Sequence, residues 1–371
     1  MANKLSLYAN VGPALTQYDV DVDGAALHRG GTVMLPANVQ YVWPHASRRF
    51  LYVATSDSAS GMGATGNTHH VTAFRIDPAS GALSPHGAPI RLPTRPIHMA
   101  TDIPSRFILV AFSNPSGLRV YRINDDGTPG EEVAQPGPID PGIFAHQVRA
   151  TLDNRLVILV ARGHDAADGK SEEPGALKVF DFNDGVLSNE VSVAPDGGYG
   201  FGPRHLDFHP SQPWVYVSLE RQNAVDMFEI ADGRLSATPR FRKPTLGRPP
   251  VGPQLVGPQL VGTVHVHPDG RTVYVANRAR DAAGENSLAV FAIDAASGEP
   301  NLIQHIASHG VHPRTFHIDP SGRLMAVAHI TGATLSLFRI APDGRLDFAR
   351  TYDIDVGQGT MWWMGMVDHP A

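Results

Sequence analysis

The sequence of 371 residues contains no cysteine, which excludes disulfide bonds and thiolate metal sites. Charged residues make up only 18% of the chain, and the formal net charge is -6. A nucleic-acid-binding surface needs clustered Lys and Arg, so this composition predicts no nucleic-acid partner. No run of about 18 apolar residues is present, which predicts no membrane-spanning helix. The N-terminal residues lack the apolar segment of a signal peptide, and we therefore expect a cytoplasmic protein.

Glycine and proline, by contrast, are abundant. The 37 Gly and 31 Pro are too many for a helical protein and suit many short strands joined by turns. One pattern recurs seven times: a strand of alternating polarity leads into a polar turn that ends in glycine. The seven turn glycines are Gly24, Gly81, Gly127, Gly185, Gly233, Gly298 and Gly344.

Each repeat also contains a second, more apolar strand upstream of the first. Nearly continuous Val, Ile, Leu, Tyr and Ala predict a strand that is covered on both faces. These strands are expected at 5–10, 50–55, 107–113, 156–162, 214–220, 272–278 and 324–329.

A repeat of several strands every 46 to 65 residues is typical of the blades of a β-propeller. We predict an all-β, seven-bladed β-propeller that forms a single domain over residues 1–371. The ring is expected to close by pairing of a C-terminal strand, 360–366, with the N-terminal partial blade, which leaves no open sheet edge. Two packed β-sandwiches are the alternative, although seven matched repeats fit that architecture poorly.

Two segments interrupt the repeat. Residues 251–262 read VGPQLVGPQLVG, a tandem duplication that we expect to form a loop between blades. Residues 161–175 form a long polar excursion between two strands. Each is interpreted as a lid over a binding site or as a tolerated surface insertion.

Ionisable residues gather where strands begin and end. When the repeats are placed in register, one column of residues lies six positions before the end of the first strand and another lies ten positions after it. The ionisable members of the two columns are His146, Arg162, Arg204, Glu220, Arg278 and Arg314. If these positions face one mouth of the central channel, several guanidinium groups, an imidazole and a carboxylate meet in one pocket. Such a pocket suits the binding of an anion and the transfer of a proton.

Structural roles are alternatives for each of these residues. Glu220 could be an ion-pair partner of Arg204 or Arg278 that joins neighbouring blades. Arg162 could anchor the polar excursion, Arg314 could stabilise a turn, and His146 could be a hydrogen-bonded core residue.

The other histidines point to structural roles first. Hydrogen bonding between blades is the expected use of His98, His205, His265, His267 and His317. His265 and His267 are the one compact pair that could bind zinc, but the turn Pro268–Asp269–Gly270 follows them directly, so we predict no metal and no cofactor.

Three segments carry a resemblance to a known family. GPRHLDFHPSQPWVYVSLE (202–220), VHVHPDGRTVYVANR (264–278) and HPRTFHIDPSGRLMAVAH (312–329) resemble the seven-bladed β-propeller lactonase family. This family includes bacterial 6-phosphogluconolactonase and a fungal 3-carboxy-cis,cis-muconate lactonizing enzyme. The resemblance covers essentially the whole chain.

The resemblance implies a metal-independent site of one histidine, two arginines and one glutamate. By motif these are His146, Arg204, Glu220 and Arg278, the same four that the column comparison selects. Arg314, Arg162, His98, His205 and His329 are the expected substrate-binding residues. The sequence departs from the family at His329, where Asn is usual, and at Ala111–Phe112–Ser113, where Ala-Asn-Tyr is customary.

We therefore expect an enzyme that hydrolyses a small anionic lactone of sugar-acid or aromatic catabolism, with Glu220 or His146 as the base. Arg204 and Arg278 would bind the anion and the developing oxyanion. A muconate-type cycloisomerase that binds a diacid is the alternative reaction, and a non-catalytic binding propeller is the alternative outside enzymes. The sequence leaves a monomer and a homo-oligomer equally open.

Overall fold

The computed structural model describes residues 4–58, 64, 66–166, 169–247, 259–354 and 360–369. They form two compact units. Unit 1 comprises Met1–Val20, Leu27–Ser192 and Trp362–Ala371, and unit 2 comprises Asp21–Ala26 and Val193–Met361. Strands and the 3-10 turn η1 (Pro195–Gly198) are the regular elements of these residues. That the whole chain forms one domain stays a prediction.

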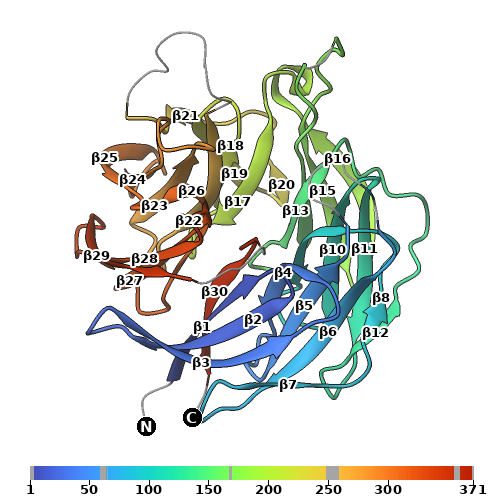
Figure 1. Cartoon of the computed structure of the whole chain (residues 1–371). Coiled ribbons are helices and arrows are strands. Elements are labelled where there is room, and N and C mark those ends of the chain that lie inside the picture. Colours follow the sequence, from blue (N-terminus) through green and yellow to red (C-terminus); the bar gives the residue numbers. More distant parts are fainter. Residues whose placement is uncertain are drawn as a thin grey trace. The chain divides into compact units, whose positions relative to one another are not determined.

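Four antiparallel sheets belong to unit 1 (Figure 1). The first, in order of pairing, contains β3 (Ala26–Met34), β2 (Ala14–Asp21), β1 (Lys4–Val11) and β30 (Met364–His369). The second contains β4 (Asn38–Pro44), β5 (Phe50–Ser56), β6 (His69–Ile76) and β7 (Leu83–Pro85), with β8 (Ile90–Arg91) also paired to β6. The third contains β12 (Pro129–Glu132), β11 (Ser116–Ile123), β10 (Phe107–Ser113) and β9 (Pro96–Thr101). The fourth contains β13 (Ala145–Ala150), β14 (Leu156–Ala161), β15 (Ala176–Asn183) and β16 (Val186–Val193).

Three sheets of the same kind belong to unit 2. The first contains β17 (Pro203–Phe208), β18 (Trp214–Leu219), β19 (Ala224–Ala231) and β20 (Arg234–Leu235), with β21 (Phe241–Pro244) also paired to β19. The second contains β22 (Leu260–Val266), β23 (Thr272–Arg278), β24 (Ser287–Ile293) and β25 (Pro300–Ala307). The third contains β26 (Val311–Ile318), β27 (Leu324–Thr331), β28 (Thr334–Ile340) and β29 (Leu346–Asp353). Seven sheets of four or five strands confirm the predicted number of blades.

The apolar strand of each repeat lies inside its sheet and is covered on both faces. Every residue of β5, β10, β14, β18 and β23 is buried. The predicted bounds of these strands agree with the observed ones to within one residue. Burial on both faces explains why an uninterrupted apolar run, rather than an alternating one, marks this strand.

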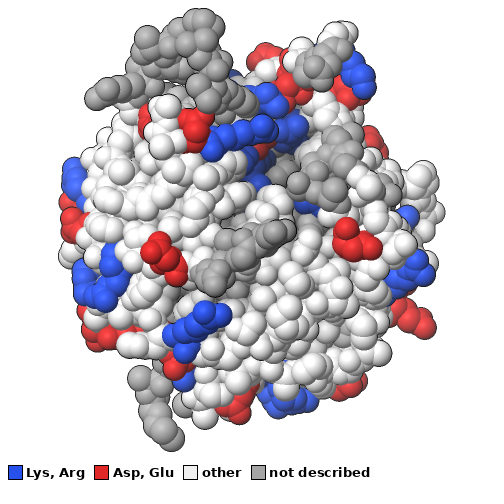
Figure 2. Space-filling view, viewed as in Figure 1, with Lys and Arg blue, Asp and Glu red and all other residues white. Residues whose placement is uncertain are grey.

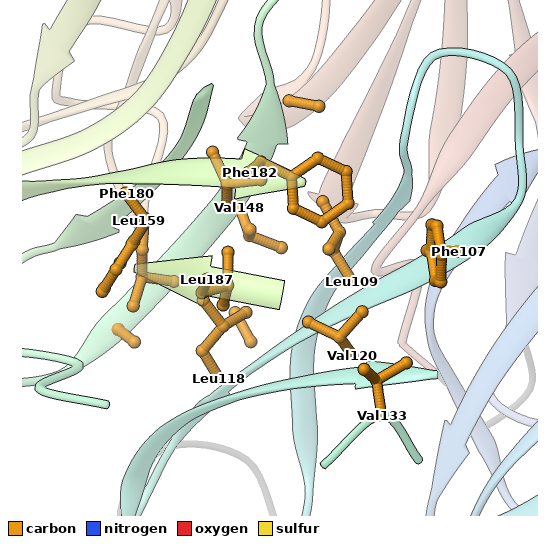
Figure 3. Close-up of a cluster of buried hydrophobic side chains, with 14 residues drawn as sticks. Phe107, Leu109, Leu118, Val120, Val133, Val148, Leu159, Phe180, Phe182 and Leu187 are labelled. Carbon is orange, nitrogen blue, oxygen red and sulfur yellow. The ribbon is translucent and has the colours of Figure 1, made fainter. Parts of the chain in front are cut away.

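Neighbouring sheets of unit 1 pack face to face through apolar side chains. Figure 3 shows one such cluster, in which Phe107 and Leu109 of β10 lie close to Val148 of β13 and Phe182 of β15. The rings of Phe107 and Phe182 meet edge to face, with centroids 5.9 Å apart. Each fully buried side chain of this size contributes roughly 1.5–3 kcal/mol, so such layers hold adjacent blades together.

A tyrosine also fastens one blade to the turn of the next in both units. In unit 1 the hydroxyl of Tyr52 donates to the carbonyl of Gly127 (2.9 Å), and Tyr8 bonds Gly81 in the same way (2.7 Å). In unit 2 Tyr216 donates to the carbonyl of Gly298, and Tyr274 to that of Gly344, both at 2.8 Å. Four of the seven turn glycines counted in the sequence therefore accept a tyrosine bond that joins two blades.

The turn at Gly298 requires glycine for two reasons. Its φ is +76°, in the left-handed region, and a Cβ atom there would lie 2.6 Å from the Trp214 ring. The first turn differs, because Ala25 rather than Gly24 occupies the left-handed conformation, with φ +46°. In the first turn, glycine at position 24 is thus not needed for a left-handed backbone.

The C-terminal strand completes the first sheet, as predicted. β30 pairs with β1 in antiparallel register from Lys4↔His369 to Ala9↔Met364, and Figure 1 shows the two strands side by side. The strand begins four residues later than the predicted 360. The side-chain oxygen of Asn10 accepts hydrogen bonds from the amides of Trp362 (3.0 Å) and Trp363 (2.8 Å), so these amides do not enter the ladder.

The two predicted interruptions lie partly outside the described residues. Of the duplicated segment, residues 251–258 are outside, whereas Leu260–Gly262 belong to β22 instead of a loop. In the polar excursion, residues 167 and 168 are outside. His164 and Glu173 pair there as an isolated bridge.

The tyrosine bonds predict a specific loss of stability. Tyr216→Phe removes the hydroxyl and leaves the buried side of the Gly298 carbonyl without its partner. We expect the free energy of unfolding to fall by about 1–2 kcal/mol in urea titrations followed by fluorescence. Tyr199→Phe, at an exposed tyrosine of the same unit, is the matched control. Equal stability of the two variants would show that the bond contributes nothing.

Candidate active site

In six of the seven sheets the first strand along the chain carries a β-bulge where the predicted column of site residues lies. The strand register shifts at Ala145/Gln147 in β13, at Pro203/His205 in β17 and at Pro313/Thr315 in β26. β4, β9 and β22 shift at the equivalent place. The residues at the six bulges are Gln40, Ile97, His146, Arg204, Gly262 with Thr263, and Arg314. A bulge leaves its extra residue unpaired and changes the direction of that side chain. The residues of the column therefore share the same local backbone geometry.

Three of the predicted catalytic residues meet in unit 2. Nε of Arg204 lies 3.0 Å from Oε1 of Glu220, and Nη2 of Arg278 donates to the same oxygen. Glu220 directly follows β18, Arg204 is the bulged residue of β17 beside it, and Arg278 ends β23 in the next sheet. The predicted pairing of Glu220 with both arginines is therefore present in the structure.

All three side chains are withdrawn from solvent. The side chains of Arg204, Glu220 and Arg278 are exposed by 2%, 6% and 6%. Charges in such a place need partners, since removing one member of a buried pair leaves the other uncompensated. One carboxylate between two guanidinium groups leaves the set positive, which favours the approach of an anion.

His312, which the sequence analysis did not select, completes the set. Its Nε2 accepts a hydrogen bond from Nη1 of Arg278 at 2.8 Å. Burial, followed by the positive charges of Arg278 and three further arginines, lowers the pKa of His312 to about 3. The imidazole is therefore neutral at pH 7 and adds no charge to the set.

Arg314 and His205 lie beside this set. Arg314 is half-buried, and its charge is among those that lower the pKa of His312. His205 is buried, with its Nε2 3.5 Å from Nη1 of Arg204. Of the three predicted substrate-binding residues of this unit, Arg314 and His205 thus adjoin the arginine set, and His329 is described below.

The sequence contained one signal for His312. It stands two residues before Arg314 in the segment HPRT, within a part of the chain that carries the family resemblance. Its backbone is left-handed, with φ +63°, and the amide of His312 is bonded to Oδ1 of Asn286 at 2.8 Å. A left-handed histidine held by a distant asparagine leaves no pattern in a single sequence.

His146 and Arg162 occupy a second group, in unit 1. His146 is the bulged residue of β13 and is buried, and its ring is near-parallel to that of Phe144 at 6.4 Å. The Arg162 guanidinium carbon lies 4.6 Å from the centre of the same ring, and Nη2 of Arg162 is 3.8 Å from a carboxylate oxygen of Asp165. Phe144 has a left-handed backbone, with φ +56°, which is costly for a bulky residue.

His98 and His329 have the contacts of structural residues. His98 is fully buried, packs 4.0 Å from the Tyr41 ring centre, and its Nδ1 accepts from the amide of Val148 at 3.4 Å. His329 is fully buried, and its Nδ1 lies 3.0 Å from the hydroxyl of Thr334. A Cβ atom at Gly310 would approach the His329 ring to 2.4 Å, so the backbone itself covers this imidazole. These contacts favour structural roles over the predicted contact with substrate: His98 bonds between neighbouring blades, and His329 bonds within one blade.

Figure 2 shows a group of Lys and Arg side chains on one face of the molecule, whereas most of that face is uncharged. With His312 neutral, Arg204 and Arg278 face the single carboxylate of Glu220, and the charge of Arg314 acts on the adjoining His312. An anionic ligand would supply the charge that this set lacks.

Among the described residues, no three His, Asp or Glu side chains are grouped as a metal ion would need. The predicted metal independence stays a prediction. The same residues contain no helix long and apolar enough to cross a membrane.

Comparison with known proteins identifies relatives over nearly the whole chain. Residues 6–363 match the family model described as "Lactonase, 7-bladed beta-propeller". The chain is 28% identical to 6-phosphogluconolactonase of Bacillus subtilis (strain 168), with 89% of this chain and 88% of that protein covered. It is 29% identical to 6-phosphogluconolactonase of Enterobacter sp. (strain 638), with 89% of each covered.

The solved structures show the same fold. A periplasmic gluconolactonase of Pseudomonas aeruginosa superposes with a TM-score of 0.78 at 22% identity, covering 99% of this chain and 100% of that one. The predicted seven-bladed β-propeller is confirmed. The cytoplasmic location stays a prediction, and this neighbour is a periplasmic protein.

The low pKa of His312 predicts how stability changes with pH. The unfolded chain binds a proton on this imidazole below about pH 6.5, whereas the folded chain does so only near pH 3. Stability from this group is therefore complete above pH 6.5 and is lost as the pH falls toward 3. His329, whose pKa is lowered to about 4 chiefly by burial, acts in the same direction.

Urea titrations at pH 7 and pH 5 test this assignment. The wild-type chain is expected to be less stable at pH 5, and His312→Gln, which cannot titrate, should lose about 1–2 kcal/mol less between the two pH values. The same loss in both proteins would mean that His312 is protonated in the folded chain.

Proposed function

The chain belongs to the seven-bladed β-propeller lactonase family, and on this premise we propose that it hydrolyses a small lactone whose negative group binds the buried arginines of unit 2. The predicted enzyme class, a lactonase, is confirmed at the level of the family. The substrate, the catalytic residues and the absence of a metal belong to the proposal.

One observation carries the proposal: Arg204 and Arg278 share a single carboxylate oxygen of Glu220 in a buried place. This arrangement holds two guanidinium groups in fixed orientations and keeps a net positive charge. Arginine pairs with phosphate or carboxylate through two parallel hydrogen bonds and does not lose its proton at working pH. The set is therefore prepared for an anion before any substrate arrives.

Glu220 is better suited to orient the arginines than to accept a proton. Its Oε1 is bonded to two cationic groups, which stabilise the negative charge that a base would have to give up. Of the two bases that the sequence left open, this argues against Glu220, and the role of His146 as a base stays a prediction from the sequence. In the proposed reaction a base takes a proton from water as the oxygen attacks the lactone carbonyl, and the ring C–O bond then breaks to give a hydroxy acid.

The names of the relatives suggest which lactone to offer first. The curated relatives are 6-phosphogluconolactonases, and the set of positive charges in unit 2 suits a phosphorylated lactone better than a neutral one. We propose 6-phosphogluconolactone as the substrate to test.

A substrate panel tests the reaction. Acid release is followed with 6-phosphogluconolactone, gluconolactone and a muconolactone, each with and without a chelator. The phosphorylated lactone is expected to open with the highest kcat/KM, at the same rate with chelator. A protein that opens none of them is not a lactonase for small anionic lactones.

Two variants test the assigned roles in the same assay. Arg278→Lys keeps a positive charge but loses the planar fork, and kcat/KM should fall by about 10²-fold or more. His146→Gln removes the base that the sequence predicts, and if that prediction holds kcat should fall by about 10²- to 10⁴-fold. Arg271→Lys, at an exposed arginine of unit 2, is the matched control. Wild-type kinetics in Arg278→Lys would contradict the anion site.

A further inference from the structure

The hydrogen bond from Arg278 fixes which nitrogen of His312 carries the proton. A guanidinium group has only donors, so Nε2 of His312, 2.8 Å from Nη1 of Arg278, must present its lone pair. In a neutral imidazole the proton then resides on Nδ1. The low pKa of His312 agrees with the neutral form. The side chain is therefore a hydrogen-bond donor at Nδ1. The lone pair of Nε2 is occupied by the bond from Arg278, so this nitrogen cannot act as a base.

The Nδ1 donor is accessible and unused. In the part of the chain that the structure describes, this nitrogen has no hydrogen-bond partner. It is also not fully buried. The His312 side chain is half-buried, whereas Arg278 beside it is almost fully buried. The N–H group thus lies on the accessible side of the arginine set.

The backbone holds this donor in place. His312 has φ +63°, a conformation that costs free energy outside glycine and persists only where surrounding bonds enforce it. Its amide donates to Oδ1 of Asn286 at 2.8 Å, and the same oxygen accepts from the amide of Ala279 at 3.0 Å. Asn286 therefore ties His312 to the residue that follows Arg278.

We infer that Nδ1–H of His312 donates a hydrogen bond to the carbonyl oxygen of the lactone and stabilises the oxyanion that forms there. This inference rests on the proposed function. As a base takes one proton from water and the water oxygen bonds to the carbonyl carbon, the C=O electron pair moves to the carbonyl oxygen, and His312 binds that charge without giving up its own proton. When the ring C–O bond breaks, the carbonyl reforms and the ring oxygen takes the proton that the base removed from water.

This role differs from those of the other residues. A fixed neutral donor is effective where charge develops, because it needs no reorganisation during the step. Arg204 and Arg278, oriented by Glu220, are left to hold the substrate's own anion. His312 thereby becomes a catalytic residue that touches the reacting atoms, in addition to the residues predicted from the sequence.

Two substitutions test the roles of the two ring nitrogens of His312 one at a time. His312→Gln places an amide oxygen near the position of Nε2, so it can still accept from Arg278 while the Nδ1 donor is lost. His312→Asn places an amide N–H near Nδ1 and loses the acceptor for Arg278, and asparagine tolerates the left-handed backbone. His309→Gln is the matched control, since His309 is exposed and also left-handed, with φ +60°.

The expected result is a split between kcat and KM. His312→Gln should lose about 10²- to 10³-fold in kcat with little change in KM. His312→Asn should keep most of kcat and raise KM, because Arg278 is held less firmly. The reverse order, or an unchanged kcat in His312→Gln, would overturn the donor role and leave His312 as a positioning residue for Arg278.

Binding measurements separate this inference from the proposed function. If wild-type protein opens no lactone and binds no 6-phosphogluconate, the proposed function fails, and the inference fails with it. If wild-type protein turns over and His312→Gln binds 6-phosphogluconate within about threefold of wild type, a normal kcat in that variant rejects the inference alone. Circular dichroism confirms folding; should His312→Gln not fold, loss of kcat in His312→Asn would overturn the inference.

Discussion

The structure of the site depends on one buried carboxylate shared by two guanidinium groups. Glu220 stands between Arg204 and Arg278, and each of the three would be a costly isolated charge in this place. Together they satisfy one another and still leave excess positive charge. The same contact thus explains why the residues stay buried and why the site attracts an anion.

The rest of unit 2 supplies the rigidity that this contact needs. Arg204 leaves its strand at a β-bulge, Glu220 follows a wholly buried strand, and Arg278 ends another. The hydroxyl of Tyr216 fastens the sheet that carries Arg204 and Glu220 to the turn of the sheet that carries Arg278. This bond between blades therefore helps to hold Arg278 at a fixed distance from Glu220 and Arg204.

Much of this arrangement could be predicted from the sequence because the repeat is explicit. Apolar runs marked the buried strands to within a residue, and placing the repeats in register selected the bulged residues without knowledge of the bulges. The C-terminal strand was placed too early because Trp362 and Trp363, although apolar, bond to Asn10 instead of the ladder. His312 was missed because its importance comes from a left-handed backbone and from contacts with Asn286 and Arg278, which no spacing reveals.

Calorimetric titration with 6-phosphogluconate tests the central claim most directly, because it measures the anion site apart from catalysis. Wild-type protein should bind this acid, with an affinity that falls as salt is added, and should bind unphosphorylated gluconate more weakly. A folded Arg204→Gln variant, which keeps Glu220 but loses one guanidinium, should bind at least about tenfold more weakly, a difference of about 1.4 kcal/mol. Equal affinity of the wild-type and variant proteins for 6-phosphogluconate would contradict the assignment of the shared carboxylate and its arginines as the anion site.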